Sequence, residues 1–345
     1  MAAFCGDDVI AVAVKDSHRE ATPVRGCDQA EPTGISDALT AVARGPGRPN
    51  DAYMQVPSHV EYERAKSIDH ALSLLTRPET RVLAGGHSLI PMMKLRLAQP
   101  ELLVDINGLT ELAFIRRDGD ELRIGALARH ADLLDSAVAG ECYPIFHDAE
   151  RVVADPIVRL WGTIGGSLCQ ADPSEDLSAV FAAVRATAVI RGQAGDRTIP
   201  VRDFHLGPYE TVVGPGELLA EIRVPVRPAT GSAYEKVSRR VGDWSIAAAG
   251  AVLQLDGTPE RPVIVSAGLG LTAVGAEHFV AAQAEEFLRG RAADEESFAA
   301  AAAIAAEHCH PSADQRGPQD YKRHLVAELT TRALRRAAAR VTLEA

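Results

Sequence analysis

Two pairs of adjacent glycines place the narrowest limits on how this chain can fold. The first pair, Gly85-Gly86, lies in "TRVLAGGHSLIPMMKLRL", where an apolar strand pattern ends and an amphipathic helix pattern begins. The second pair, Gly165-Gly166, lies in "WGTIGGSLCQ", again beside small hydroxyl residues. A strand that ends in Gly-Gly and turns directly into a helix exposes backbone N–H groups that no side chain covers. Such a turn is suited to binding a phosphate or diphosphate.

Each turn taken alone has a simpler explanation, in which the glycines only make a tight turn and Ser88 caps the following helix. Two such turns in one α+β region favour a long ligand that is held at two places. The segment after the second turn, "DPSE", has the form of a capping box with Asp172 at the N-cap and Glu175 at N3. Because carboxylates repel a diphosphate, a sugar or ribityl hydroxyl is the better partner for Asp172 or Asp176.

The periodicity of the sequence divides the chain into three parts. Residues 1–52 mix glycine, proline and acidic residues without sustained periodicity, so we expect a disordered extension or a misassigned start. Residues 53–228 predict an α+β domain, and residues 229–345 predict a second domain with a small antiparallel sheet covered by helices. We expect four arginines of the last helix to form a solvated face: Arg332, Arg335, Arg336 and Arg340.

Composition and missing motifs exclude several classes of function. A net charge of −11 argues against a nucleic-acid partner. The 5 cysteines are widely spaced, so the chain encodes neither a zinc nor an iron–sulfur site, and free thiols fit a reducing compartment. No apolar run has membrane-spanning length and no basic segment precedes an apolar one at the N-terminus, so we expect a cytoplasmic protein without a transmembrane segment. The GxGxxG, P-loop, GxSxG and HExxH patterns are absent, and we assign no catalytic residue and no metal ligand.

From Met54 onward the chain resembles the FAD-binding medium subunits of molybdenum hydroxylases, in the xanthine dehydrogenase family, and above all the flavoprotein subunits of aerobic carbon monoxide dehydrogenases. The matching segments, in chain order, are "AGGHSLIPMMKLRLAQPELLVDI", "DPIVRLWGTIGGSL" with "ADPSEDL", "GELLAEIRVP", "AYEKVSRRVGDWSIAAAGAVL" and "DQRGPQDYKRHLVAELTTRAL". The resemblance implies an α+β fold of the vanillyl-alcohol-oxidase or PCMH type, with two α+β subdomains that enclose FAD. A C-terminal domain with an antiparallel sheet and helices would follow.

The resemblance also implies which residues bind FAD, without a covalent bond to His87. In the family the two Gly-Gly turns hold the diphosphate, and acidic residues and a lysine lie near the cofactor. The matching positions are Ala84, Gly85, Gly86, His87, Ser88, Thr163, Ile164, Gly165, Gly166, Ser167, Asp172, Asp176, Lys236 and Trp244. Ser167 stands where the family usually has asparagine, so one amide contact is lost. Trp244 stands where tyrosine is common; it either shields the flavin ring or, as the sequence alone favours, packs in the core.

The function implied by the resemblance is electron transfer. FAD would accept electrons one at a time from a small partner subunit with [2Fe–2S] clusters, which a large molybdopterin subunit supplies, and pass them to a quinone, NAD or oxygen. The implied assembly is a dimer of heterotrimers. One alternative is a stand-alone flavin-dependent oxidase or reductase of the same fold, for which the sequence reveals no substrate pocket or base. Another is a binding module that has lost FAD, against which the intact Gly-Gly turns argue.

Overall fold

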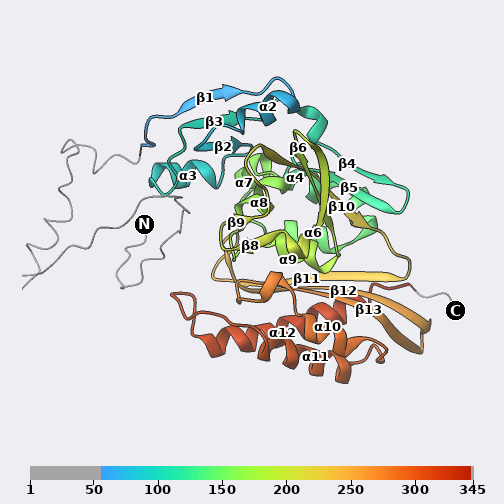
Figure 1. The fold of residues 1–345 in the computed structure, drawn as a ribbon. Helices are drawn as coiled ribbons and strands as arrows, with labels where there is room; N and C mark the ends of the chain where they lie inside the picture. Colours follow the sequence, from blue (N-terminus) through green and yellow to red (C-terminus); the bar gives the residue numbers. More distant parts are fainter. Residues whose placement is uncertain (1–55, 343–345) are drawn as a thin grey trace, which may run out of the picture. The chain divides into compact units, whose positions relative to one another are not determined.

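The computed structural model describes residues 56–342, within one compact unit that spans Gln55–Ala345 (Figure 1). The extension expected at residues 1–52 lies outside the described residues. The described strands form four sheets, which helices connect or cover. This arrangement is the α+β class that the sequence predicts. Across residues 56–342, no helix is both long and apolar enough to cross a membrane.

The first sheet is parallel, and its edge strand leads into the first Gly-Gly pair. Its strands, in spatial order, are β1 (Glu61–Arg64), β3 (Leu102–Asp105) and β2 (Thr80–Leu83). Parallel strands need crossover connections, and the helices α2 (Ile68–Leu74) and α3 (Leu89–Lys94) lie on these connections. Because β2 ends at Leu83 and α3 begins at Leu89, Gly85-Gly86 forms the strand-to-helix turn that the sequence predicts.

The second sheet is antiparallel and carries the largest core. Its strands, in spatial order, are β4 (Ile115–Asp118), β5 (Glu121–Gly125), β10 (Glu217–Pro225), β6 (Thr187–Gly192) and β7 (Gly195–Pro200). Between β5 and β6 the chain forms the helices α4 (His130–Asp135), α5 (Ala137–Cys142), α6 (Ile145–Glu150), α7 (Pro156–Trp161), α8 (Ile164–Gln170) and α9 (Leu177–Ala183). A two-stranded sheet, β8 (His205–Gly207) and β9 (Glu210–Thr211), follows β7. Every residue of α9 is buried, so this helix lies at the centre of the domain.

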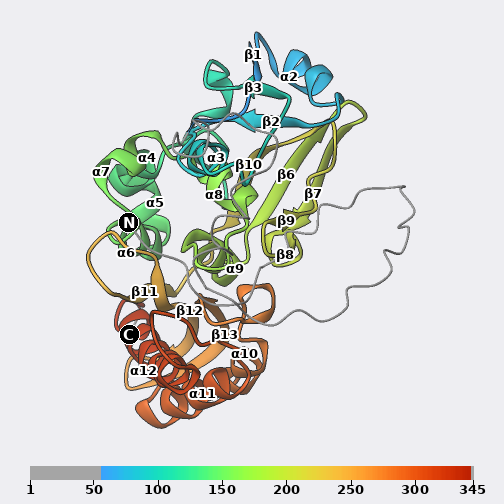
Figure 2. The ribbon, with the colours of Figure 1, turned by 90° about the vertical axis from the view of Figure 1, so that its left-hand side faces the viewer.

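The third large element is an antiparallel sheet with helices on one face. It consists of β11 (Thr230–Ser238), β12 (Ser245–Thr258) and β13 (Arg261–Thr272), and the helices are α10 (Ala282–Leu288), α11 (Glu295–Glu307) and α12 (Gln319–Ala338). Helix α9 packs on the opposite face (Figure 2). A Cβ on Gly268 or Gly270 of β13 would lie 2.0 Å from a carbonyl oxygen of α9. These glycines of "GLGL" therefore allow close packing of strand on helix.

The last helix is not a fully solvated arginine face, so this expectation is wrong for two of its four residues. Arg336 and Arg340 bind the carboxylate of Asp148 on α6, at 2.5 and 2.6 Å, and Asp148 is 8% exposed. Arg332 and Arg335 do pair with acids in exposed positions. Periodicity reports the side of a helix on which a residue lies, but the partner of that residue comes from a distant segment.

Candidate functional site

The two Gly-Gly turns lie in contact with each other. A Cβ on Gly85 would lie 2.1 Å from the carbonyl oxygen of Trp161 and 2.8 Å from the Cα of Gly162. Because no real side chain tolerates such distances, only glycine at position 85 allows the backbone of the second turn to approach this closely. The segments 84–88 and 161–166, far apart in the sequence, thus form one continuous site.

The first turn has the exposed amide groups that its sequence predicts. Gly86 adopts φ +76°, a left-handed conformation that favours glycine. Within the described part of the chain, no group accepts a hydrogen bond from the N–H of Gly85, Gly86, His87 or Ser88. Ser88 occupies the N-cap position of α3, but its hydroxyl makes no capping bond. Four consecutive donors without a protein partner match the oxygen atoms of a diphosphate.

The second turn is built differently, because most of its amide groups already have partners. Gly166 N–H donates to Thr163 Oγ1 at 3.0 Å, which caps α8. Ile164 N–H and Gly165 N–H donate to the carbonyl oxygens of Ala128 and Ala126, both at 2.9 Å. A Cβ on Gly165 would lie 2.6 Å from the Cβ of Ala126. Glycine here permits close packing behind the turn, so the exposed N–H groups that the sequence pattern predicts are found mainly at the first turn.

The predicted capping box, with Asp172 at the N-cap and Glu175 at N3, does not form. Helix α9 begins at Leu177 rather than immediately after Asp172, and Glu175 caps it by accepting from the N–H groups of Leu177 and Ser178. Ser167 Oγ also donates to Glu175, at 2.7 Å, so this hydroxyl is occupied within the protein. The Asp172 carboxylate accepts from Ser174 N–H and from a tyrosine hydroxyl instead of capping α9.

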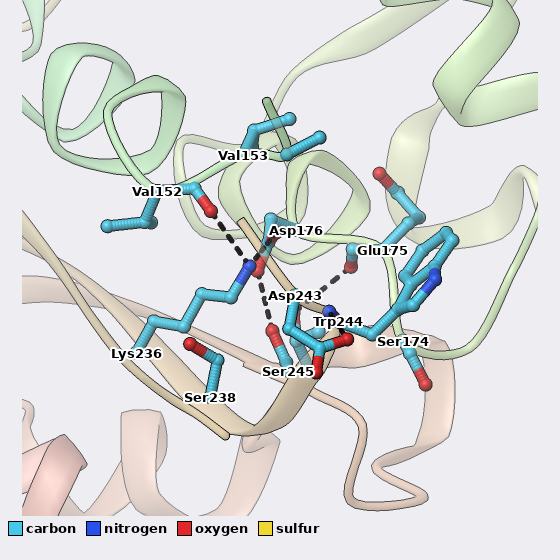
Figure 3. A network of polar contacts seen from close by, with 12 residues as sticks. Val152, Val153, Ser174, Glu175, Asp176, Lys236, Ser238, Asp243, Trp244 and Ser245 are labelled. Atoms are coloured by element: carbon cyan, nitrogen blue, oxygen red, sulfur yellow. Dashed lines mark hydrogen bonds and ion pairs between the residues drawn. The ribbon is translucent and has the colours of Figure 1, made fainter. Parts of the chain in front are cut away.

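Asp176 and Lys236 form a buried ion pair, with their charged atoms 2.7 Å apart (Figure 3). The sequence singles out both residues but does not predict that they meet. Asp176 also accepts hydrogen bonds from the hydroxyls of Tyr234 and Ser245, at 2.7 and 2.8 Å, and Lys236 donates to the carbonyl of Val152. Burial and the nearby Asp176 charge raise the pKa of Tyr234 well above its usual value, so its hydroxyl remains a donor. The pair ties the start of α9 to β11 and β12.

Trp244 lies in the loop between β11 and β12 and is 46% exposed, so it does not pack in the core (Figure 3). Its loop also carries Gly242, where a Cβ would lie 3.2 Å from the carbonyl of Ala154. The neighbouring Arg239 and Arg240 are largely exposed beside Asp243. The exposed indole of Trp244 is available to contact a ligand or another chain.

Residues that sequence analysis missed lie behind and between the turns. His130 N–H donates to the carbonyl of Gly162, and His130 Nδ1 lies 3.1 Å from the buried carboxylate of Glu150. Burial by itself would lower the pKa of His130, but the nearby carboxylates, Glu150 above all, raise this pKa above its usual value. Burial also raises the pKa of Glu150. Asn107 and Arg129 connect the two turns through hydrogen bonds. No local motif marks these residues, because each acts on a segment distant in sequence.

Fold and site together define a class of protein: an α+β protein whose two adjoining glycine turns suit a long, phosphate-containing cofactor, with a helix-covered antiparallel sheet in the following domain. Comparison with known families agrees. Residues 58–227 match the FAD binding domain in molybdopterin dehydrogenase, and residues 232–337 match the CO dehydrogenase flavoprotein C-terminal domain.

Similar proteins extend the match over most of the chain. The carbon monoxide dehydrogenase medium chain of Afipia carboxidovorans is 40% identical over 83% of this chain and 99% of its own length. The glyceraldehyde dehydrogenase medium chain of Sulfolobus acidocaldarius is 35% identical over 82% of this chain and 99% of its own length. A solved carbon monoxide dehydrogenase chain from Hydrogenophaga pseudoflava superposes with a TM-score of 0.79, 40% identity, 83% coverage of this chain and 100% of that chain.

The chain belongs to the FAD-binding medium subunits of carbon monoxide dehydrogenase-like molybdenum hydroxylases, as its sequence motifs indicate. It is an FAD-binding oxidoreductase subunit, and its relatives are subunits of carbon monoxide, glyceraldehyde and xanthine dehydrogenases. Membership in this family implies small and large partner subunits. The residues present fit FAD, because the first turn offers unpaired donors beside a second glycine turn.

Proposed function

We propose that this chain transfers electrons through FAD from [2Fe–2S] clusters of a small partner subunit to a quinone, NAD or oxygen. A large molybdopterin subunit would oxidise the substrate and supply the electrons. Bound FAD supplies redox chemistry in one- and two-electron steps, and the protein binds and orients it. The observation that carries the proposal is the first turn, with four consecutive N–H donors against the second Gly-Gly turn, in a chain of the medium-subunit family.

The proposed FAD site divides its residues by role. Gly85, Gly86, His87 and Ser88 contribute the donors for the diphosphate, Ala84 leads into their turn, and binding is noncovalent. The second turn limits how far the diphosphate can move, because Gly85 allows the backbone of Trp161 and Gly162 to lie directly against the first turn. Its proposed members are Thr163, Ile164, Gly165, Gly166 and Ser167.

The remaining proposed residues act at the sides of the cofactor. Asp172 is half-buried just after the C-terminal end of α8, and it accepts a ribityl or sugar hydroxyl. Trp244 shields the flavin ring with its exposed indole. The charges of Asp176 and Lys236 neutralise each other. Their ion pair holds the loop of Trp244 and the start of α9 in place beside the cofactor.

The proposal also includes the assembly and the compartment. The medium-subunit relatives support one small and one large partner, and we propose a dimer of such heterotrimers in the cytoplasm. A test is to purify tagged protein from its native host and identify the proteins that accompany it. An iron–sulfur subunit and a molybdenum subunit should be recovered with FAD in a stoichiometric complex. Recovery of a flavin-loaded chain alone, with oxidase or reductase activity of its own, would favour the stand-alone alternative.

FAD binding by the chain itself is tested by reconstitution. The purified chain, mixed with FAD and passed through a desalting column, should retain a flavin absorption spectrum. Photoreduction in the presence of the purified small subunit should then show electron exchange between its clusters and the flavin. Retention of FAD without such exchange would leave the cofactor assignment intact and refute the electron-transfer role.

A further inference from the structure

We propose that Arg129 is a positioning residue that fixes the spacing between the two Gly-Gly turns before FAD binds. This inference rests on the proposed FAD site and concerns a residue outside both glycine motifs. Arg129 follows β5 and occupies the N-cap position of α4, so its backbone is anchored in the second sheet and its first helix. Its N–H donates to Asp132 at 2.8 Å, which holds the residue in this position.

The Arg129 guanidinium binds Trp161 at the second turn and Asn107, which leads to the first turn. Nη1 donates to the carbonyl oxygen of Trp161, at the end of α7 and immediately before the second turn. Nη2 donates to Oδ1 of Asn107 at 2.7 Å. The planar guanidinium presents its donors in a rigid fork, so the two acceptors are held at a fixed separation.

Asn107 continues the connection to the first turn. Its Nδ2 donates to the carbonyl oxygen of Ala84 at 2.7 Å, and its N–H and Nδ2 also bond to Asp105 Oδ1 at 2.8 and 2.7 Å. Asp105 ends β3 and is 8% exposed, so Asn107 is anchored in the first sheet. The hydrogen bonds thus run from Ala84 through Asn107 and Arg129 to Trp161.

The Trp161 carbonyl links this connection to the glycine motif. The same oxygen that accepts from Arg129 lies 2.1 Å from the position of a Cβ on Gly85. Glycine at position 85 permits the approach, and Arg129 supplies the hydrogen bond that satisfies the carbonyl there. The spacing between the first-turn donors and the second turn is therefore set by groups of the protein alone.

A direct role as a phosphate-binding cation is the competing explanation, and the two predict different results. Hydrogen exchange of the apo chain would be compared for wild type, Arg129→Gln, Arg129→Lys and Asn107→Ala. Positioning predicts faster exchange of the hydrogen-bonded amides of the second turn in all three variants when FAD is absent; these amides are Gly162, Ile164, Gly165 and Gly166. A cation that acts only on bound phosphate would leave the apo exchange unchanged, and this result would overturn the proposal.

FAD affinity provides the second measurement, by titration of each apo chain with FAD. Arg129→Gln and Asn107→Ala should each weaken FAD binding at least about tenfold. Because both substitutions break the same connection, the loss of affinity in the double variant should be smaller than the product of the two single losses. Lysine keeps the charge but lacks the fork, so Arg129→Lys should fail to restore affinity. Full FAD affinity in Arg129→Lys would refute positioning. Full affinity in both single variants, Arg129→Gln and Asn107→Ala, would refute it as well.

Arg191→Gln is the matched control, because it removes an arginine of the same domain that pairs with Asp196 on the surface. It should bind FAD like wild type. If wild type itself retains no FAD, the proposed FAD site fails; if wild type binds and the Arg129 variants bind equally well, only this inference fails. Should Arg129→Gln not fold, Asn107→Ala tests the same connection from its other end.

Discussion

The carbonyl oxygen of Trp161 sits against the Cα of Gly85, at 2.1 Å from where a Cβ would be. This contact makes one site out of two turns that belong to different parts of the cofactor domain: the first joins β2 to α3, and the second joins α7 to α8. The first turn leaves its N–H groups without partners among residues 56–342, whereas the second uses most of its own to pack on Ala126 and Ala128. The two similar motifs therefore have different physical tasks.

A side chain at position 85 should separate the turns and weaken FAD binding. Gly85→Val places carbon atoms on the Trp161 carbonyl, and Gly165→Val places them on Ala126, at backbone that cannot rotate away. Overpacking of about 1–3 kcal/mol predicts that the Kd for FAD rises about fivefold or more, measured as flavin retained per protein after desalting. The control is Gly207→Ala, whose Cβ would meet only a Glu210 oxygen at 3.9 Å. Normal retention in both valine variants would contradict the role of the turns.

Removal of Lys236 should leave a buried carboxylate without its counter-charge. Lys236→Met is expected to lower the free energy of unfolding by about 3 kcal/mol, because Asp176 is 6% exposed and keeps only two hydroxyl donors. The measurement is urea denaturation of the apo chain. Adding Asp176→Asn to this variant should recover part of the loss, since the unpaired charge is then gone. Lys66→Met, at an exposed position, should change stability by less than about 0.5 kcal/mol.

His205 should make the chain acid-sensitive. Burial lowers the pKa of His205 to about 4, and its Nε2 lies 3.1 Å from both the Leu168 carbonyl and Ser178 Oγ. In the unfolded chain the pKa of a histidine is about 6.5. Because the pKa is lower in the folded state, the unfolded state binds the proton more readily below pH 6.5, so the stability present above that pH is lost as pH falls toward 4. Between pH 7 and pH 5 the loss amounts to about 2 kcal/mol.

His205→Gln, which has no group that titrates there, should reduce the dependence of the unfolding free energy on pH by that amount. His59→Gln, at an exposed position, is the control and should follow wild type. An identical pH dependence in His205→Gln and wild type would show that His205 is not the group responsible.

The arginines of α12 and of the residues just after it should differ sharply in their importance. Arg336→Met with Arg340→Met leaves the buried Asp148 carboxylate with only a 3.3 Å contact to Tyr234 N–H, so we expect a loss of about 3 kcal/mol. Arg332→Met removes an exposed pair with Glu328 on the same helix and should cost about 0.5 kcal/mol or less. Equal losses, measured by chemical denaturation, would show that the contact with Asp148 contributes nothing beyond a surface pair.

The sequence by itself determined the local conformations of the site. Gly85-Gly86 ends a strand and begins a helix because only glycine tolerates the φ of +76° at position 86 and the bare backbone at position 85. The α+β class and the family, which the sequence motifs indicate, were confirmed. Such features depend on interactions between residues that are near one another in the chain, so a single sequence carries them.

Only the tertiary structure decided which distant groups meet. It paired Asp176 with Lys236, gave Arg336 and Arg340 a buried acid, and exposed Trp244. It also placed Asn107 and Arg129 between the two turns. The physical reason is that hydrogen bonds and ion pairs of this kind depend on how sheets and helices pack, and no local pattern records the partner of a side chain.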